Sequence, residues 1–213
     1  MKFKTGLIRQ LLPVFLTLLI LFEIVAYASM SPRPTEKFFQ LYVLGSNGAA
    51  DNYYPNNSSY LKVGESVSWH LGIVNDMGSA QFVAIRVKLG NLTIAAPNDT
   101  LATPSPAPMV AEFRQFMPDN GTWEMSFSWE VTNFTITPDG HILTLELMIN
   151  NSTYVIQNPP SCIALSCSFR IIFELWAWSV TAADFQFGWS NGGQQQIAWL
   201  QLWFNLASAG KSK

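Results

Sequence analysis

Few side chains in this sequence are suited to chemistry, and the two histidines stand first among them. His70 and His141 each fall at or near the polar side of a predicted strand, where a metal ion would need both of them and a nearby carboxylate. The chain has no nucleophile elbow, no P-loop, no dinucleotide-binding glycine motif and no HExxH motif. We therefore predict no catalytic residue, no metal site and no cofactor, and we expect a protein that is not an enzyme. The alternative is an enzyme that pairs one of these histidines with a neighbouring acid.

The only two cysteines, Cys162 and Cys167, lie close together in the sequence. In an oxidising compartment such a pair can form a disulfide that closes a small loop between strands. A metal site would need two further soft ligands beside them, and the sequence offers none. We therefore expect a disulfide, and two free thiols are the alternative.

Asparagine sequons are dense in this chain. Eight Asn-x-Ser/Thr triplets occur, where the composition predicts about two by chance. The excess predicts Asn-linked glycans on solvent-facing loops, and therefore export. Part of the excess has a structural explanation, because Asn, Ser and Thr all favour turns. The eight acceptor positions are Asn56, Asn57, Asn91, Asn98, Asn120, Asn133, Asn150 and Asn151.

Tryptophans are the second candidates for ligand binding. Trp69, Trp123 and Trp129 fall on the buried faces of alternating strands, so we expect them in the core. Four others belong to strands that are apolar on both sides, and such strands are either sheet centres or carry an outward aromatic patch. An outward patch would stack on sugar rings or dock a partner. These four are Trp176, Trp178, Trp199 and Trp203.

The first thirty residues differ from the rest of the chain. Basic residues precede an apolar run whose residues 7–28 are just long enough to cross a bilayer. This order predicts a single-pass protein of the cell membrane with its C-terminal domain outside. A signal peptide cleaved after Ala28 and a buried helix of a soluble protein are the alternatives. Glu23 weighs against the anchor, since a lone carboxylate is costly in lipid.

Composition excludes several classes of protein. The chain has 213 residues, of which 49% are hydrophobic and 12% charged, and this composition excludes intrinsic disorder. The net charge is −2, but residues 38–210 carry five basic and twelve acidic groups, a net charge of −7. We therefore expect no binding of nucleic acid.

Hydrophobic alternation with a period of two organises the chain from residue 38 onward. Such alternation predicts strands with one buried face, and a helical spacing occurs only over 109–116. We predict an all-β fold, an antiparallel two-sheet sandwich of the Ig-like kind preceded by one transmembrane helix. A small barrel is the alternative. The predicted strands are 38–44, 66–75, 81–89, 122–131, 141–149, 152–157, 168–178, 184–189 and 197–206.

The sequence predicts four segments. Residues 1–30 form the anchor, 31–37 a stiff stalk, 38–207 the exterior β-sandwich and 208–213 a flexible tail. The Pro-rich segment 103–108 could divide the exterior part, but the strands before it are too few to cover their own sheet. We therefore expect an extended crossover between the two sheets there.

Four short motifs open the exterior part: FQLYVLG at 39–45, YYPN at 53–56, VGE at 63–65 and LGIVN at 71–75. In this order they resemble the archaeal domain of unknown function 1616. The later segments 170–176 and 198–204 are similar to variants in ammonia-oxidising archaea. The resemblance implies an archaeal, membrane-anchored exterior protein without an assigned activity, and it carries over no catalytic residue.

These motifs also predict local geometry. We expect Gly45 and Gly64 to serve turns with a positive φ. We expect the segment 74–78 to form a hairpin that leads into the strand 81–89.

We therefore expect an N-glycosylated, membrane-anchored cell-surface protein with a structural or adhesive role in an archaeal envelope. Its partners would be the membrane, through residues 7–28, and other envelope proteins or glycans. The alternative is an exterior module that binds a carbohydrate or another ligand through exposed aromatic side chains.

Overall fold

The computed structural model describes residues 5–30, 36–139, 141–157, 159, 168–191 and 193–206. The chain divides into two compact units, Met1–Thr35 and Glu36–Lys213. Both cysteines of the predicted disulfide, Cys162 and Cys167, lie outside the described residues. So do residues 31–35 of the predicted stalk and the predicted tail.

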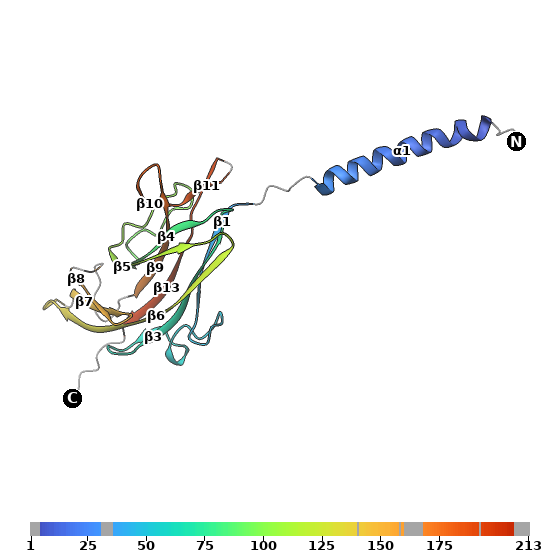
Figure 1. Ribbon diagram of the computed structural model, residues 1–213. Coiled ribbons are helices and arrows are strands. Elements are labelled where there is room, and N and C mark those ends of the chain that lie inside the picture. The colour runs from blue at the N-terminus through green and yellow to red at the C-terminus, as the bar shows by residue number, and fades with distance from the viewer. Residues whose placement is uncertain are drawn as a thin grey trace. The chain divides into compact units, whose positions relative to one another are not determined.

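Helix α1, Thr5–Met30, makes up the first unit (Figure 1). A membrane crossing requires about 20 consecutive, predominantly apolar residues, whereas Pro13, Thr17 and Glu23 interrupt the apolar run of α1. Within the described part of the chain, no helix has both the length and the apolar character for a crossing. The prediction of a single-pass anchor through residues 7–28, with the C-terminal domain outside, is therefore wrong.

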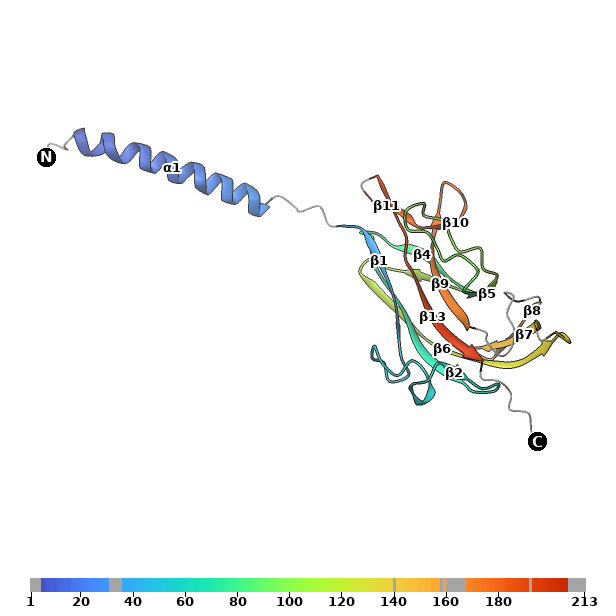
Figure 2. The same ribbon diagram turned by 180° about the vertical axis from the view of Figure 1, so that it is seen from behind.

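The second unit is mostly β, and Figures 1 and 2 show its strands from two sides. Within the described residues, one sheet has the order β1-β3-β6-β7-β8 and the other the order β2-β13-β9-β4-β5, with β10 paired to β9. The first sheet contains β1 (Phe38–Leu44), β3 (Val67–Asp76), β6 (Gly121–Ile136), β7 (Ile142–Ile149) and β8 (Ser152–Gln157). The second contains β2 (Tyr60–Leu61), β4 (Gln81–Asn91), β5 (Met109–Met117), β9 (Ser168–Ser179), β10 (Asp184–Phe187) and β13 (Trp199–Leu206).

A small ribbon accompanies these sheets, formed by β11 (Trp189–Asn191) and β12 (Gln194–Gln196). The described strand pairs are antiparallel except for β13 with β2, which is parallel. The predicted strand 184–189 is thus split between β10 and the start of β11.

Inward side chains of the two sheets form one core. Trp69 of β3 packs on Trp129 of β6, with ring centroids 5.3 Å apart, and on Phe173 of β9 in the opposite sheet, at 6.1 Å. Both tryptophans are fully buried, as their alternation predicted, and Trp123 is partly buried against the same core. The alternation therefore identified the buried side of these strands correctly.

Residues 109–116, the only stretch with helical spacing after residue 40, belong to the strand β5. This strand pairs with β4 from Gln81 opposite Met117 to Lys88 opposite Met109. Pairing with a neighbouring strand satisfies the backbone here, and this tertiary contact outweighs the local spacing.

The segment 92–108, which we name the strap, joins β4 to β5. These strands are neighbours in one sheet, so the Pro-rich part of the strap is not a crossover between sheets. The strap instead lies over the outer face of that sheet, where Ser105 and Ala107 are buried. It is closed on itself by paired backbone hydrogen bonds between Asn98 and Thr103.

Two further local predictions need correction. Gly64 has the expected positive φ of 80°, but Gly45 does not. Gly45 is small for a different reason, because a Cβ there would lie 1.7 Å from the carbonyl oxygen of Asp51. The segment 74–78 is not a hairpin, since β3 and β4 lie in different sheets. The Asn75 side chain stabilises this connection between the two sheets by donating hydrogen bonds to the carbonyls of Ser79 and Pro118.

Candidate functional site

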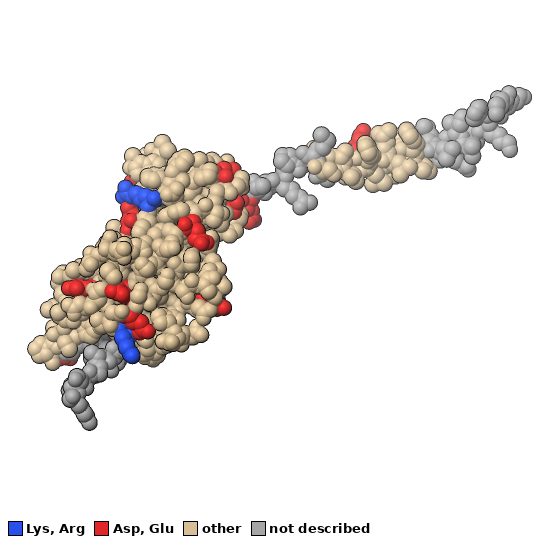
Figure 3. Space-filling model, turned by 60° about the horizontal axis from the view of Figure 1, so that its bottom comes forward, with Lys and Arg blue, Asp and Glu red and all other residues tan. Residues whose placement is uncertain are grey.

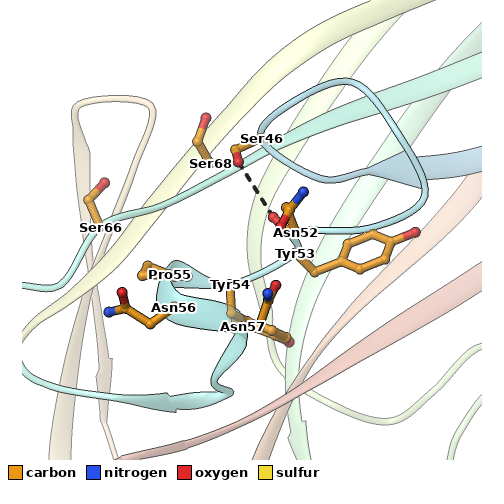
Figure 4. Close-up of a pocket in the computed structure, with 9 residues that line it drawn as sticks. All are labelled: Ser46, Asn52, Tyr53, Tyr54, Pro55, Asn56, Asn57, Ser66 and Ser68. Carbon is orange, nitrogen blue, oxygen red and sulfur yellow. Dashed lines mark hydrogen bonds between the residues drawn. The ribbon is translucent and has the colours of Figure 1, made fainter.

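A cavity of about 400 Å³ opens beside the loop that follows β1. The loop ends in a short 3-10 turn, η1 (Pro55–Asn57), and the start of β3 forms the opposite wall. Figure 4 shows the side chains around it. The lining residues are Ser46, Asn52, Tyr53, Tyr54, Pro55, Asn56, Asn57, Ser66 and Ser68.

The two tyrosines of the cavity wall hold the loop against the sheets. The Tyr53 hydroxyl donates to the carbonyl of Val43, and the Trp69 indole N–H donates to the carbonyl of Tyr53. The Tyr54 hydroxyl donates to the carbonyl of Trp203 in the other sheet, with an O–O distance of 2.6 Å. Burial raises the pKa of Tyr54, so its phenol stays a neutral donor. Both tyrosine hydroxyls therefore already donate hydrogen bonds within the protein. The rings and the backbone of Tyr53 and Tyr54 form the cavity wall.

Asparagine and serine side chains supply the free polar groups of the cavity. Within the described residues, the side chains of Asn56, Asn57, Ser66 and Ser68 have no hydrogen-bond partner in the protein, and all four residues are exposed. No lining residue carries a charge at neutral pH. The cavity can therefore offer several neutral donors and acceptors together with the apolar surface of Tyr53, Tyr54 and Pro55.

A polar surface continues from the cavity along the five-stranded sheet, and we name it the open face. Ser68 and His70 alternate along β3 and therefore point to the same side, and Ser66, which immediately precedes the strand, lines the cavity with Ser68. His70 Nδ1 lies 3.3 Å from Glu124 Oε1, and the Tyr42 hydroxyl donates to Glu124 Oε2 at 3.1 Å. Partial burial and then this bond to Glu124 raise the pKa of Tyr42.

The structure does not bring the two histidines together. His70 pairs with Glu124, whereas His141 lies 3.6 Å from Asp139. Neither histidine lines the cavity, although Ser68 links it to His70 along the strand. Within the described residues, no three His, Cys, Asp or Glu side chains gather into a group that could hold a metal ion.

Charged side chains lie beneath the strap on the outer face of the six-stranded sheet, which we name the covered face. Lys88 Nζ is 2.9 Å from Glu174 Oε2, and the two side chains are 9% and 0% exposed. Lys88 also donates to the carbonyl of Ser105, and the backbone N–H of Ser105 donates to Glu174. The strap therefore completes the hydrogen bonding of a buried ion pair.

The four predicted binding tryptophans all project from this covered face, on alternating positions of β9 and β13. The Arg86 guanidinium lies 3.8 Å above the ring of Trp176, and Arg170 lies 5.0 Å from the ring of Trp203. The Trp199 indole donates to Asp99 of the strap. Trp178 is 38% exposed and packs on Phe82 and Phe185. Of the two alternatives, the four side chains take the outward one, but contacts with Arg86, Arg170 and the strap leave Trp178 as the most accessible ring.

The predicted glycan acceptors fall into two groups. Asn91 is buried, and its Oδ1 accepts hydrogen bonds from the backbone N–H groups of Thr93 and Ile94, so a glycan there would have to disrupt these contacts. The Asn150 amide nitrogen, which would carry the glycan, donates to the carbonyl of Ser126 in a half-buried turn. The exposed acceptors that stay predictions are Asn56, Asn57, Asn98, Asn120, Asn133 and Asn151.

Backbone conformation explains part of the sequon excess. Five of the eight sequon asparagines have a left-handed φ, a conformation that Asn tolerates better than most residues. Asn is therefore selected at these turns for a structural reason as well. These five are Asn56, Asn57, Asn120, Asn150 and Asn151.

The surface of the domain is more acidic than its composition indicates. Of residues 38–210, two of the five basic residues, Lys88 and Arg170, are buried, against one of the twelve acidic residues, Glu174. Figure 3 shows acidic side chains scattered over one face with little Lys or Arg beside them. Such a surface disfavours polyanionic partners.

Sequence reasoning missed the cavity. Its residues come from a loop, from the turn η1, from Ser66 just before β3 and from Ser68 within β3. The signals in the sequence were the YYPN motif and the unpaired serines before the LGIVN motif. Nothing in the sequence shows that the loop folds back over Ser66 and Ser68.

Comparison with known proteins identifies no family. No family model matches the sequence, and no curated protein matches it. A β-glucosidase from Listeria innocua in complex with glucose is similar at 13% identity with a TM-score of 0.36, covering 80% of this chain and 16% of that chain. Red sea bream transglutaminase is similar at 9% identity with a TM-score of 0.26, covering 85% of this chain and 28% of that chain. This chain thus spans a small part of each, and likeness at this level carries no argument about activity, for or against an enzyme.

Proposed function

We propose that the β-domain is a non-enzymatic binding module that takes a neutral, polyhydroxylated ligand of the carbohydrate class in the cavity. The observation that carries the proposal is the lining itself: free amides and hydroxyls, aromatic and proline surface, and no charge. The volume of about 400 Å³ falls in the range of small-molecule sites.

Sugars match this lining through two kinds of contact. Their hydroxyls exchange hydrogen bonds with amide and hydroxyl side chains, such as those of Asn56, Asn57 and Ser68. Their C–H faces pack on rings, and Tyr53 and Tyr54 are held in place by their own hydrogen bonds. Because these tyrosines are already ordered, a ligand would not have to immobilise them.

The proposal is tested by titrating the full chain, in a mild non-ionic detergent, with neutral and acidic sugars. We expect Trp and Tyr fluorescence or NMR shifts with neutral sugars only. The double variant Ser66→Ala/Ser68→Ala should bind about tenfold more weakly, since each lost hydrogen bond costs about 1 kcal/mol or less.

Ser126→Ala is the matched control for this titration. Ser126 is exposed on the neighbouring strand β6, directly opposite His70, and it does not line the cavity. Its replacement should leave the affinity unchanged. If no neutral sugar binds at millimolar concentration, or if both variants behave alike, the proposal is wrong.

A second proposal keeps the N-glycosylated structural or adhesive role in an archaeal envelope, with other envelope proteins or glycans as partners. The exposure of six sequon asparagines supports it. Peptide mass spectrometry of the natural protein should find glycans on some of these six and none on Asn91. Unmodified peptides throughout would remove this proposal. The resemblance to the domain of unknown function 1616 also stays a proposal.

The finer fold prediction, an Ig-like topology, is likewise proposed for one sheet only. The order β13-β9-β4-β5 corresponds to the G-F-C-C′ order of an Ig variable sheet. In the other sheet, β6 pairs with β3 and precedes its outer neighbour β7. In an Ig sheet the strand at the outer position precedes its inner neighbour in the sequence. The five-stranded sheet therefore departs from the Ig order.

A further inference from the structure

Strand β5 ends the six-stranded sheet. Among the described residues it pairs only with β4, and no other described segment donates a backbone hydrogen bond to its far edge. An edge strand presents a row of unpaired N–H and C=O groups, and proteins usually blunt such an edge with Pro or Lys. β5 contains neither residue over Met109–Met117, and a register shift beside Val110 limits its regular edge to residues 111–117.

The outward side chains of β5 carry charge and exposed apolar surface. Glu112, Arg114 and Phe116 alternate along the outer face, and the Arg114 side chain and Phe116 are 56% and 64% exposed. Glu112 is already held by Arg86 at 2.7 Å and by Arg114 at 2.6 Å. The edge strand therefore presents one cation, Arg114, whose side chain is 56% exposed, beside one carboxylate, Glu112, whose side chain is 15% exposed.

The order of these residues is self-complementary. If two β5 strands pair antiparallel about a two-fold axis at Phe113, Glu112 of each copy lies opposite Arg114 of the other. Phe116 then lies at the end of the paired segment, since Val110 is buried in the core at a register shift of the strand. Axes at Glu112 or Arg114 would instead place like charges opposite each other, so one register is favoured.

The two edge strands of the five-stranded sheet, β1 and β8, lack this feature. Their sequences, FFQLYVL and STYVIQ, carry no charge that could select a register. We therefore infer that the edge of β5 is a homodimer interface, in which two copies of this chain join their six-stranded sheets through antiparallel pairing centred on Phe113. The inference is independent of the cavity and of its proposed ligand.

Charge exchange between two variants tests the inference. The full chain in a mild detergent is analysed by light scattering that corrects for bound detergent. We expect wild type to be dimeric, and we expect Arg114→Glu and Glu112→Arg each to dimerise roughly 100-fold more weakly, because like charges then face each other twice. An equimolar mixture of the two variants should form heterodimers, since both cross-strand pairs become complementary again.

Three results would overturn the inference. The first is a wild type that is monomeric at about 0.1 mM, a concentration at which dimers of micromolar affinity are populated. The second is a wild-type dimer that neither variant weakens. The third is an equimolar mixture of the variants that stays monomeric. Because Glu112→Arg can disturb the fold beside Arg86, circular dichroism checks each variant. Hydrogen exchange on wild type gives a readout without mutation: protection of amides in 111–115 should rise with protein concentration. Protection that rises in β8 instead would also overturn it.

Discussion

The outer faces of the two sheets differ in how accessible their polar side chains are to solvent. The covered face buries Lys88 and Glu174 beneath the strap, whereas the open face leaves Ser66, Ser68 and the His70–Glu124 pair accessible. Both faces carry polar side chains at alternating strand positions, so the difference does not come from the strands themselves. It comes from the connection between β4 and β5, which is long enough to fold back over its own sheet. The buried ion pair and the accessible polar surface therefore lie on different sides of one domain.

The largest expected effect is on the covered face. Lys88→Met leaves Glu174 buried without its cation, and we expect a loss of about 3–5 kcal/mol in the free energy of unfolding. Denaturant titration measures this loss. The double variant Lys88→Met/Glu174→Gln should cost less than the sum of its single changes, because no unpaired charge then remains. A loss below about 1 kcal/mol for Lys88→Met would show that the strap does not seal the pair.

A second effect belongs to the cavity loop. Gly45→Ala places a Cβ against the backbone carbonyl of Asp51, which cannot rotate away as a side-chain end can. We expect a loss of about 1–3 kcal/mol, comparable to overpacking in a core, and weaker sugar binding. Gly48→Ala isolates backbone strain from steric overlap, because Gly48 has a positive φ of 74° but open space around its Cβ position, and we expect it to cost about 1 kcal/mol. Equal sugar affinity in Gly45→Ala and wild type would show that the conformation of this loop does not affect binding in the cavity.

A third, smaller effect depends on pH. Burial raises the pKa of Glu112, but hydrogen bonds from Arg86 and Arg114 outweigh burial and hold it below its usual value. A lowered folded-state pKa stabilises the protein above the unfolded-state pKa, and this contribution is lost as the pH falls through the folded-state pKa. Glu112→Gln should therefore be less stable than wild type by about 1 kcal/mol at neutral pH.

This difference should shrink as the solution is acidified from about pH 5 to about pH 3. Denaturation of wild type and Glu112→Gln at both ends of that range measures the difference. A gap that stays constant with pH would mean that the carboxylate charge of Glu112 contributes nothing to stability.

The smallest effect is expected on the open face. Glu124→Gln weakens contacts to His70 and Tyr42, but the Glu124 side chain is 44% exposed and water replaces what is lost. We expect a change below about 1 kcal/mol in the free energy of unfolding. A loss as large as that of Lys88→Met would remove the contrast between the two faces.

Much of the fold followed from local patterns. Alternation identified the strands that contain Trp69, Trp129 and Phe173 and showed which side of each strand is buried. It missed β5, because Met109–Met117 mixes apolar and charged residues without a clean period and is defined by its pairing with β4. The predicted anchor is wrong, since Pro13, Thr17 and Glu23 interrupt the apolar run of the helix.

The candidate site was less predictable than the fold. The sequence pointed to aromatic side chains such as Trp176 and Trp203, and both do project outward from their strands. Their accessibility depends on Arg86, Arg170 and the strap, which reach them from distant parts of the chain. The cavity likewise depends on how the loop 45–57 closes against Ser66 and Ser68.

By itself, the sequence determined the mostly β character of the domain, the buried side of its main strands, the surplus of acidic residues and the turns that favour Asn and Gly. These properties depend on neighbours in the chain, whose spacing sets which side each residue faces. Only the tertiary structure decided which outward-facing residues stay accessible. That outcome depends on contacts between segments far apart in the sequence, as when Ser105 of the strap meets Glu174 of β9 or Tyr54 of the loop meets Trp203 of β13. No local pattern encodes such contacts, and they separate the covered ion pair from the open cavity.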